Sequence, residues 1–225
     1  MNGVFVTGTD TDVGKTWVGQ KIIQQLILNG ISVETRKPIE SGWRVDVTQC
    51  DAWKLAHAAK KTQKLDVVCP NRFLSAISPD RAAKVEGELI TIEQLSKQCT
   101  KGFDTKDDFL YVEGAGGFYS PICADGLNAD LAKALNLPVV LIVADRLGCI
   151  NHTLLSIEAI ERRGLKLLGV VLNKIDESSA EPQNMNNHDD LSEKINYPIV
   201  LSSESFDFAG TVCNWFRLKH FSIIS

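Results

Sequence analysis

The 225-residue chain lacks the features of secreted, membrane-spanning and nucleic-acid-binding proteins. Its first residues contain no basic region followed by a long apolar core, since the apolar run at residues 4–6 leads directly into a glycine-containing loop. No apolar stretch approaches the roughly 20 residues that cross a bilayer. With 24 Lys and Arg against 28 Asp and Glu, the net charge of −4 gives no overall basic field. We therefore expect a cytoplasmic protein that binds neither nucleic acid nor a membrane.

The cysteines do not form the pattern of a disulfide framework or a zinc site. No Cys-x-x-Cys pair occurs, and no His stands at zinc-like spacing from a Cys. We expect buried or idle thiols in a reducing compartment. The six are Cys50, Cys69, Cys99, Cys123, Cys149 and Cys213.

Apolar runs rich in β-branched residues alternate with segments of helical periodicity. Runs such as PVVLIVA are apolar throughout, which is typical of strands covered on both faces of a parallel sheet. The pattern predicts one α/β domain over residues 1–225, with a doubly wound, mostly parallel sheet, helices on both faces, and the P-loop nucleotide-hydrolase type of fold. The predicted strands are 3–7, 32–37, 109–113, 138–144, 165–173 and 198–201, and the predicted helices are 15–29, 91–100, 128–135, 151–163 and 191–195. The polar segment 177–190 is expected to be a surface loop.

The segment VTGTDTDVGKT, residues 6–16, joins the first predicted strand to the first helix. Five residues separate its two glycines, one more than in the common phosphate-binding loop. Backbone N–H groups at a helix N-terminus bind phosphate oxygens, and the Lys-Thr pair would reach the phosphates and Mg²⁺. We expect nucleotide binding by Asp12, Val13, Gly14, Lys15 and Thr16.

Two further stretches follow predicted strands at the same edge of the sheet. In RKPIESG, residues 36–42, Lys37 is placed to neutralise a transferring phosphoryl group, although a solvated basic turn is the alternative. In VEGAGG, residues 112–117, Glu113 stands where nucleotide-hydrolysing folds keep a Mg²⁺-associated acid, and Gly116 allows a close approach to the nucleotide. A glycine-rich turn with a surface glutamate is the alternative. Asp51 begins a helical stretch, either as a second metal ligand or as a helix cap.

Two loops that follow later predicted strands complete the set. LGCINH, residues 147–152, is a loop-to-helix junction whose free N–H groups suit an anion such as a carboxylate. In NKID, residues 173–176, Asn173 is placed to bond a purine edge, and the tetrapeptide matches the Asn-Lys-x-Asp guanine signature of GTPases. A simple turn is the alternative for this short match.

In order along the chain, GTDTDVGKT, KPIESG, VEGAGG and LGCINH resemble the patterns of the dethiobiotin synthetase family, over most of the length up to about Asn173. The resemblance implies that 7,8-diaminopelargonic acid takes up CO₂ as a carbamate on one amine. The carbamate oxygen then attacks the γ-phosphate of ATP, with Mg²⁺ as cofactor, to give a carbamic–phosphoric anhydride. The second amine closes the ring and expels phosphate.

The resemblance also implies a role for each matching residue. The catalytic residues are Thr11, Lys15, Lys37 and Ser41. The nucleotide is bound by Asp12, Val13, Gly14, Lys15, Thr16, Glu113, Gly116 and Asn173. Mg²⁺ is held by Thr16, Asp51 and Glu113. Substrate contacts come from Thr11, Asp12, Lys37, Ser41, Cys149, Ile150 and Asn151, of which the last three serve the neighbouring subunit of a homodimer with its sites at the interface.

The chain departs from the family pattern after Asn173. YPIVLSSESFDF lacks the family's Gly-x-Ile/Val-Pro stretch, and the segment 177–190 offers no clear counterpart of a carboxylate-binding tyrosine. One alternative is a partitioning or septum-site ATPase switch, but Asp10 stands at the position of the signature lysine of those proteins. The tail TVCNWFRLKHFSIIS is interpreted as a terminal helix packed on the sheet rather than a membrane contact. The other alternative, a small GTPase, rests on residues 173–176 alone and leaves KPIESG and LGCINH unexplained.

The NKID match predicts that GTP is accepted beside ATP. Replacing the signature acid, Asp176→Ala, should lower kcat/KM for GTP about tenfold, as expected for one lost hydrogen bond to a charged group, and leave ATP unchanged. Steady-state rates with ATP, GTP and CTP measure this. Strict ATP preference that the substitution does not alter contradicts the prediction.

Overall fold

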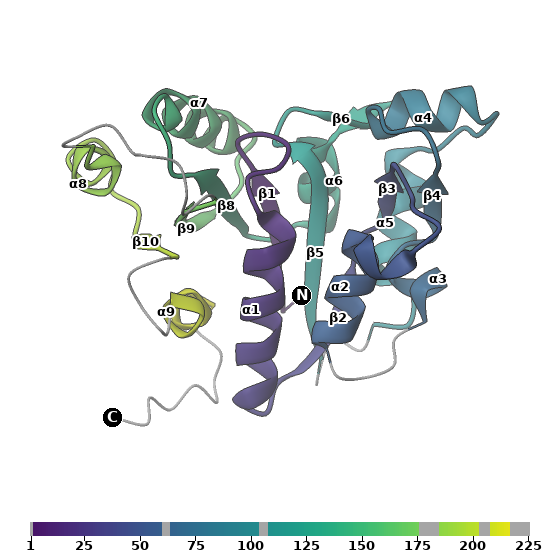
Figure 1. Ribbon diagram of the computed structural model, residues 1–225, viewed down its shortest axis with the longest axis horizontal. Coiled ribbons are helices and arrows are strands. Elements are labelled where there is room, and N and C mark those ends of the chain that lie inside the picture. Colours follow the sequence, from purple (N-terminus) through teal and green to yellow (C-terminus); the bar gives the residue numbers. More distant parts are fainter. Residues whose placement is uncertain (1, 60–63, 104–107, 176–184, 203–207, 217–225) are drawn as a thin grey trace.

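The centre of the protein is a six-stranded parallel sheet in the order β10-β9-β8-β1-β5-β2 (Figure 1). The computed structural model describes residues 2–59, 64–103, 108–175, 185–202 and 208–216. Every pair of neighbouring strands in this sheet is parallel, as the continuous apolar runs predicted. The strands are β1 (Gly3–Gly8), β2 (Ser32–Arg36), β5 (Asp108–Gly117), β8 (Val139–Ala144), β9 (Leu167–Asn173) and β10 (Ile199–Leu201).

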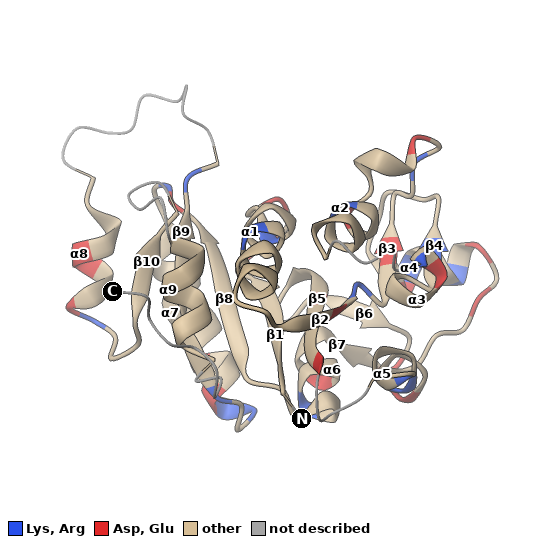
Figure 2. Cartoon of the chain, turned by 90° about the horizontal axis from the view of Figure 1, so that it is seen from below, with Lys and Arg blue, Asp and Glu red and all other residues tan. Residues whose placement is uncertain are grey.

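Helices cover both faces of the sheet, which confirms the predicted doubly wound arrangement. Side chains alternate along β1, so that Val4 and Val6 enter one core cluster and Phe5 enters the other. Figure 2 shows α1 and α2 on one side of the sheet and α5 and α6 on the other. One face carries α1 (Lys15–Leu28), α2 (Asp51–Ala58) and α9 (Phe208–Asn214), and the other carries α4 (Pro79–Val85), α5 (Ile92–Thr100), α6 (Asn128–Leu135), α7 (Cys149–Arg162) and α8 (Asn187–Ser192).

Several short elements lie outside the central sheet, toward the right of Figure 1. The strands β3 (Ile39–Ser41) and β4 (Asn71–Phe73) form a separate parallel pair. The sequence did not predict these elements, because three or four residues are too few to show a period. The others are the 3₁₀ turn η1 (Val47–Gln49), helix α3 (Leu65–Val68) and the antiparallel pair β6 (Pro121–Cys123) and β7 (Gly126–Leu127).

Most predicted elements are confirmed to within two residues at each end. The main exception among the strands is β5, which was expected to end at Glu113 but continues through the glycines to Gly117. The extension is paired, because Gly8 of β1 lies opposite Gly117. The carboxylate of Glu113 is therefore fixed inside the sheet rather than at the start of a turn.

The predicted helix at 191–195 is wrong in position. The helix found there is α8, Asn187–Ser192, and it begins inside the polar segment that was expected to be a loop. The side chain of Asn186 accepts a hydrogen bond from the backbone N–H of Asp189 and caps the helix. Residues 176–184 of that segment lie outside the described residues.

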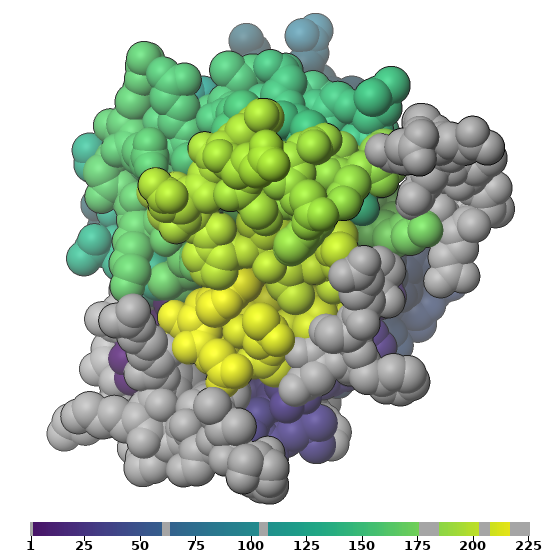
Figure 3. Space-filling model, turned by 90° about the vertical axis from the view of Figure 1, so that its left-hand side faces the viewer, coloured from purple at the N-terminus to yellow at the C-terminus, as the bar shows by residue number. Residues whose placement is uncertain are grey.

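The β10 edge of the sheet is covered by the last elements of the chain. In the side view of Figure 3, residues 185–202 and 208–216 form one continuous surface, coloured yellow-green to yellow. Val212 and Cys213 of α9 are buried in the same cluster as α1 residues, so this helix packs on its own sheet as predicted. Residues 217–225 of the tail lie outside the described part.

Two absences expected from the sequence can be checked over the described residues. The helices found there are all too short or too polar to cross a bilayer. The six cysteines, all of them in described segments, form no disulfide and are buried, which confirms the expectation of buried thiols.

Candidate functional site

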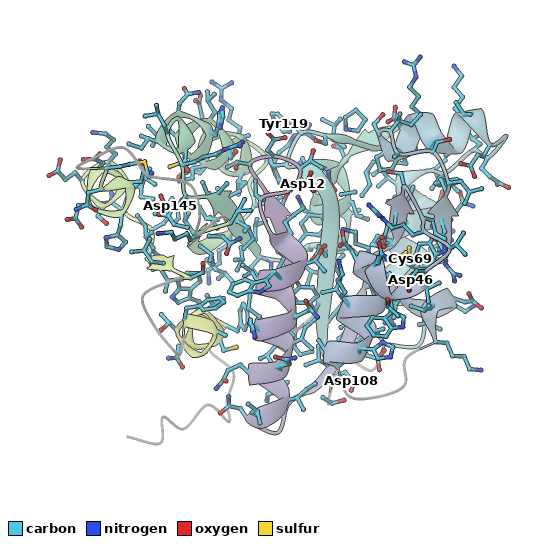
Figure 4. The ribbon with its side chains drawn as sticks, in the orientation of Figure 1. Asp12, Asp46, Cys69, Asp108, Tyr119 and Asp145 are labelled. Carbon is cyan, nitrogen blue, oxygen red and sulfur yellow. The ribbon has the colours of Figure 1, made fainter. Side chains whose placement is uncertain are left out.

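A cavity of about 870 Å³ opens at the carboxyl edge of the sheet, where the loops after β1, β2 and β5 meet. Parallel strands bring these ends together, which is where ligands bind in open α/β folds. Figure 4 shows Asp12 at this edge and Asp108, the first residue of β5, at the opposite one. Of the predicted site residues, the cavity is lined by Thr11, Asp12, Gly14, Lys15, Thr16, Lys37, Ser41, Asp51 and Gly116.

The loop between β1 and α1 has the backbone of a phosphate-binding loop. Gly14 immediately precedes α1 and has a φ of 83°, in the left-handed region that favours glycine. A Cβ atom at Gly14 would lie 2.0 Å from Nδ2 of Asn173, so space as well as backbone conformation requires glycine. The first turn of α1 carries no acidic residue, and its free N–H groups suit an anion.

Asn173, at the end of β9, holds this loop in place. Its Nδ2 donates to the carbonyl oxygen of Val13 at 3.0 Å, and its Oδ1 accepts from the hydroxyl of Ser202 at 2.8 Å. The side chain is buried and does not line the cavity. The predicted contact of Asn173 with a nucleotide base stays a prediction, and Asp176 lies outside the described residues.

Lys15 folds back over the phosphate loop. Its Nζ donates to the carbonyl oxygen of Asp10 at 2.8 Å, and the side chain is buried. Burial, and then the positive charge of Lys37, lower the pKa of Lys15 to about 8. A bound anion would compensate this buried charge.

Lys37 lies at the centre of the site between two carboxylates. Its Nζ is 2.7 Å from Oε1 of Glu113 and 3.2 Å from Oδ2 of Asp51, and it donates to the carbonyl oxygen of Gly114 at 3.3 Å. Lys37 is 4% exposed and Glu113 is 0% exposed. The alternatives of a solvated basic turn for Lys37 and of a surface glutamate for Glu113 are therefore wrong. Burial alone would lower the pKa of Lys37, but the two carboxylates outweigh it and hold the pKa above its usual value.

The three residues predicted to hold Mg²⁺ are brought together around Lys37. The hydroxyl of Thr16 donates to Oε1 of Glu113 at 2.7 Å, and Asp51 reaches the same ammonium group from the start of α2. Burial works to raise the pKa of Asp51, but Lys37 outweighs it and holds the pKa below its usual value. Two carboxylates and a hydroxyl are the hard oxygen ligands that Mg²⁺ prefers.

This donor set fits a magnesium ion that is shared with a substrate. Over the described residues, no group of three or more His, Cys, Asp or Glu side chains is arranged to hold a metal by itself. The protein would therefore supply Thr16, Asp51 and Glu113, and phosphate oxygens and water would supply the rest, as is usual for Mg²⁺ at phosphates.

The structure adds two buried residues that the sequence interpretation missed. Glu40, in β3, accepts hydrogen bonds from the backbone N–H groups of Asp51 at 2.8 Å and Ala52 at 2.9 Å. Tyr111 in β5 donates to Oε2 of Glu113 at 3.4 Å. Glu40 stands inside KPIESG, but one sequence does not reveal that it faces α2. Tyr111 stands two residues before Glu113, and residues two apart in a strand share one face. The sequence could therefore have predicted that Tyr111 lies beside Glu113.

The structure also decides how Asp51 is used. Asp51 is the first residue of α2, and the residue before it, Cys50, makes no side-chain capping bond. The helix end is bonded by Glu40 instead, so the carboxylate of Asp51 turns to Lys37. The alternative of Asp51 as a helix cap is therefore wrong.

One predicted group lies apart from the cavity. Cys149, Ile150 and Asn151 begin α7 after β8 and do not line the cavity. They were predicted to serve the neighbouring subunit, and that role stays a prediction. Ser41 and Thr11 do line the cavity, from the end of β3 and from the phosphate loop.

Comparisons with known proteins find relatives that match most of this chain. A family model described as an AAA domain matches residues 2–204. The ATP-dependent dethiobiotin synthetase of Anaeromyxobacter dehalogenans is 38% identical over 77% of this chain and 77% of its own length. The synthetase of Vesicomyosocius okutanii is 35% identical over 91% of both chains, and that of Methanocaldococcus jannaschii is 37% identical over 78% of this chain and 81% of its own.

Solved structures share the fold at low sequence identity. The MinC:MinD cell division complex of Aquifex aeolicus matches with a TM-score of 0.56 and 14% identity, covering 96% of this chain and 86% of that chain. The septum site-determining protein MinD of Pyrococcus horikoshii matches with a TM-score of 0.50 and 16% identity, covering 95% and 86%. This likeness concerns the fold alone and confirms the predicted P-loop type of doubly wound sheet.

The Gly14 contact predicts a selective effect on nucleotide binding. Gly14→Ala combines a strained φ with a collision against Asn173, so we expect nucleotide affinity to fall about 5- to 150-fold, from strain of about 1–3 kcal/mol. Gly30→Ala is the matched control, because its φ of 78° is similar, no atom lies within 4 Å of the added Cβ, and it follows the far end of α1. Calorimetric titration with ADP measures both, and equal losses in the two variants contradict the prediction.

Proposed function

The chain belongs to the dethiobiotin synthetase family of ATP-dependent ligases, and we propose that it joins CO₂ to 7,8-diaminopelargonic acid in the cavity at the carboxyl edge of the sheet. One amine adds to CO₂ and loses a proton to form a carbamate. A carbamate oxygen attacks the γ-phosphorus of ATP, and ADP leaves. The second amine then attacks the carbonyl carbon of the anhydride, and phosphate leaves as the ring closes.

The observation that carries this proposal is the position of Lys37 beside the phosphate loop. The carbamate and the γ-phosphate are both anions, and they repel one another unless cations lie between them. Lys15 lines the cavity from the loop and Lys37 from the end of β2. Two ammonium groups that line one cavity would hold the two anions for attack and stabilise the charge that develops.

The wall of the cavity suits a substrate that carries amines. Thr11, Asp12 and Ser41 line it, beyond the Gly14–Thr16 part of the loop that would take the phosphates. The carboxylate of Asp12 matches an incoming ammonium group, and the hydroxyls of Thr11 and Ser41 would orient the carbamate. The extra residue of the loop therefore serves the second substrate.

Mg²⁺ would be held by Thr16, Asp51 and Glu113 and would neutralise the charge on the β- and γ-phosphates. The protein residues keep this part of the site fixed, since Glu113 lies inside β5 and Asp51 is anchored at the start of α2. We further propose a cytoplasmic homodimer in which Cys149, Ile150 and Asn151 receive the substrate carboxylate of the neighbouring subunit.

Formation of dethiobiotin tests the proposal directly. Purified protein with 7,8-diaminopelargonate, MgATP and ¹³C-bicarbonate should release phosphate only when the diamine is present. Mass spectrometry should find the label in the product, since CO₂ supplies the ring carbonyl. Phosphate release that does not depend on the diamine, or no release, would indicate a nucleotide switch instead.

The position of Lys37 predicts a large loss of turnover on its removal. Lys37→Ala should lower kcat about 10²- to 10³-fold, because it removes a cation from the developing charge. Lys37→Ala also removes a buried partner of Glu113. Lys37→Gln keeps a hydrogen-bond donor on a side chain that is one bond shorter, and so separates the loss of charge from the loss of packing. Lys97→Ala, at an exposed ion pair on α5, is the control and should keep the native rate. A near-normal rate in the folded Lys37 variants would remove Lys37 from the mechanism.

A further inference from the structure

Glu40 is a buried carboxylate that joins two walls of the cavity. It lies in β3, between Lys37 and Ser41 in the chain, and is 8% exposed. Each of its oxygens has one partner at the start of α2. Oε1 accepts from the N–H of Asp51 at 2.8 Å, and Oε2 accepts from the N–H of Ala52 at 2.9 Å.

The start of α2 needs an acceptor from outside the helix. The first N–H groups of a helix have no partner within it, and side chains of the preceding residue usually satisfy them. Cys50 precedes α2 and makes no such bond. Glu40 supplies the acceptor from another part of the chain, and its negative charge also suits the positive end of the helix dipole.

The clamp fixes the residue that faces Lys37. Asp51 is both the first residue of α2 and the donor to Glu40, so its backbone cannot shift without breaking that bond. Its Oδ2 lies 3.2 Å from Nζ of Lys37. β3 belongs to a separate two-stranded pair rather than to the central sheet, so Glu40 links that pair to the helix that carries Asp51.

We propose that Glu40 is a positioning residue, which clamps the start of α2 and thereby holds the Asp51 carboxylate in place for Mg²⁺ at the phosphates. The proposal rests on the proposed function, in which Asp51 is a metal ligand. Glu40 lines the cavity, but both of its oxygens are engaged by backbone N–H groups, and it acts through Asp51 rather than on the substrate.

Glu40→Gln tests the clamp, because the amide keeps the size of the side chain but turns one acceptor into a donor that faces an N–H group. We expect the half-saturating Mg²⁺ concentration to rise about 10- to 100-fold, as for other residues that orient a metal ligand. At subsaturating Mg²⁺, kcat should fall in proportion, while KM for the diamine stays within about twofold. Glu40→Ala, which removes both acceptors, should show a larger effect in the same direction.

A readout without turnover accompanies these rates. Mn²⁺ binding to the protein with ADP, followed by electron paramagnetic resonance, should weaken by a similar factor in Glu40→Gln. Asp125→Asn is the matched control, because Oδ1 of Asp125 accepts from the N–H of Ile92 at 2.8 Å at the start of α5, away from the cavity. This control should keep native Mg²⁺ dependence and Mn²⁺ affinity, whatever its melting temperature.

The outcomes separate this proposal from the proposed function. If Glu40→Gln melts at a lower temperature but keeps native Mg²⁺ dependence and Mn²⁺ affinity, Glu40 is only structural and the proposal is overturned. Equal metal effects in Asp125→Asn and Glu40→Gln also overturn it. If the wild-type protein makes no dethiobiotin, the proposed function fails, and Mn²⁺ binding with ADP still decides on Glu40.

Discussion

The arrangement of the site depends on one buried ammonium group, that of Lys37. Burying an unpaired charge in a protein interior costs several kcal/mol. The buried ammonium group of Lys37 is therefore stabilised only while the carboxylates of Glu113 and Asp51 remain within hydrogen-bonding distance. Those partners come from β5 and from the start of α2. The ion pairs therefore require the end of β2, the middle of β5 and the N-terminus of α2 to meet at one point, beside the phosphate loop.

The neighbouring contacts keep these elements in register. Thr16 bonds Glu113 and so ties the first turn of α1 to the same carboxylate. Asn173 bonds Val13 from the end of β9, and only glycine at position 14 leaves room for it. Glu40 holds the start of α2. The loops that line the cavity are thus held by contacts between strand ends and helix starts, whose positions the parallel sheet determines.

The sequence predicted long elements well and short ones poorly. Apart from the carboxyl end of β5, the predicted strands agree with the structure, as do four of the five predicted helices, and most of these elements are long enough to show a period. β3 and β4, with three residues each, gave no periodic signal, although Ser41 ends one of them. The helix expected at 191–195 was misplaced because the capping bond of Asn186 starts it earlier, within a segment that its polar composition made look like a loop.

The sequence by itself determined the type of fold, because apolar runs of strand length alternate with helical segments. It also determined the phosphate loop with its Lys15–Thr16 end, and the family, because contiguous motifs carry both. The tertiary structure alone decided that Lys37 and Glu113 are buried partners, that Asp51 faces them rather than capping α2, and that Glu40 performs the capping. The physical reason is that burial and pairing of charge depend on which segments meet in space. Lys37 and Glu113 meet because the parallel strands bring their carboxyl ends to one edge, and the start of α2 brings Asp51 to them.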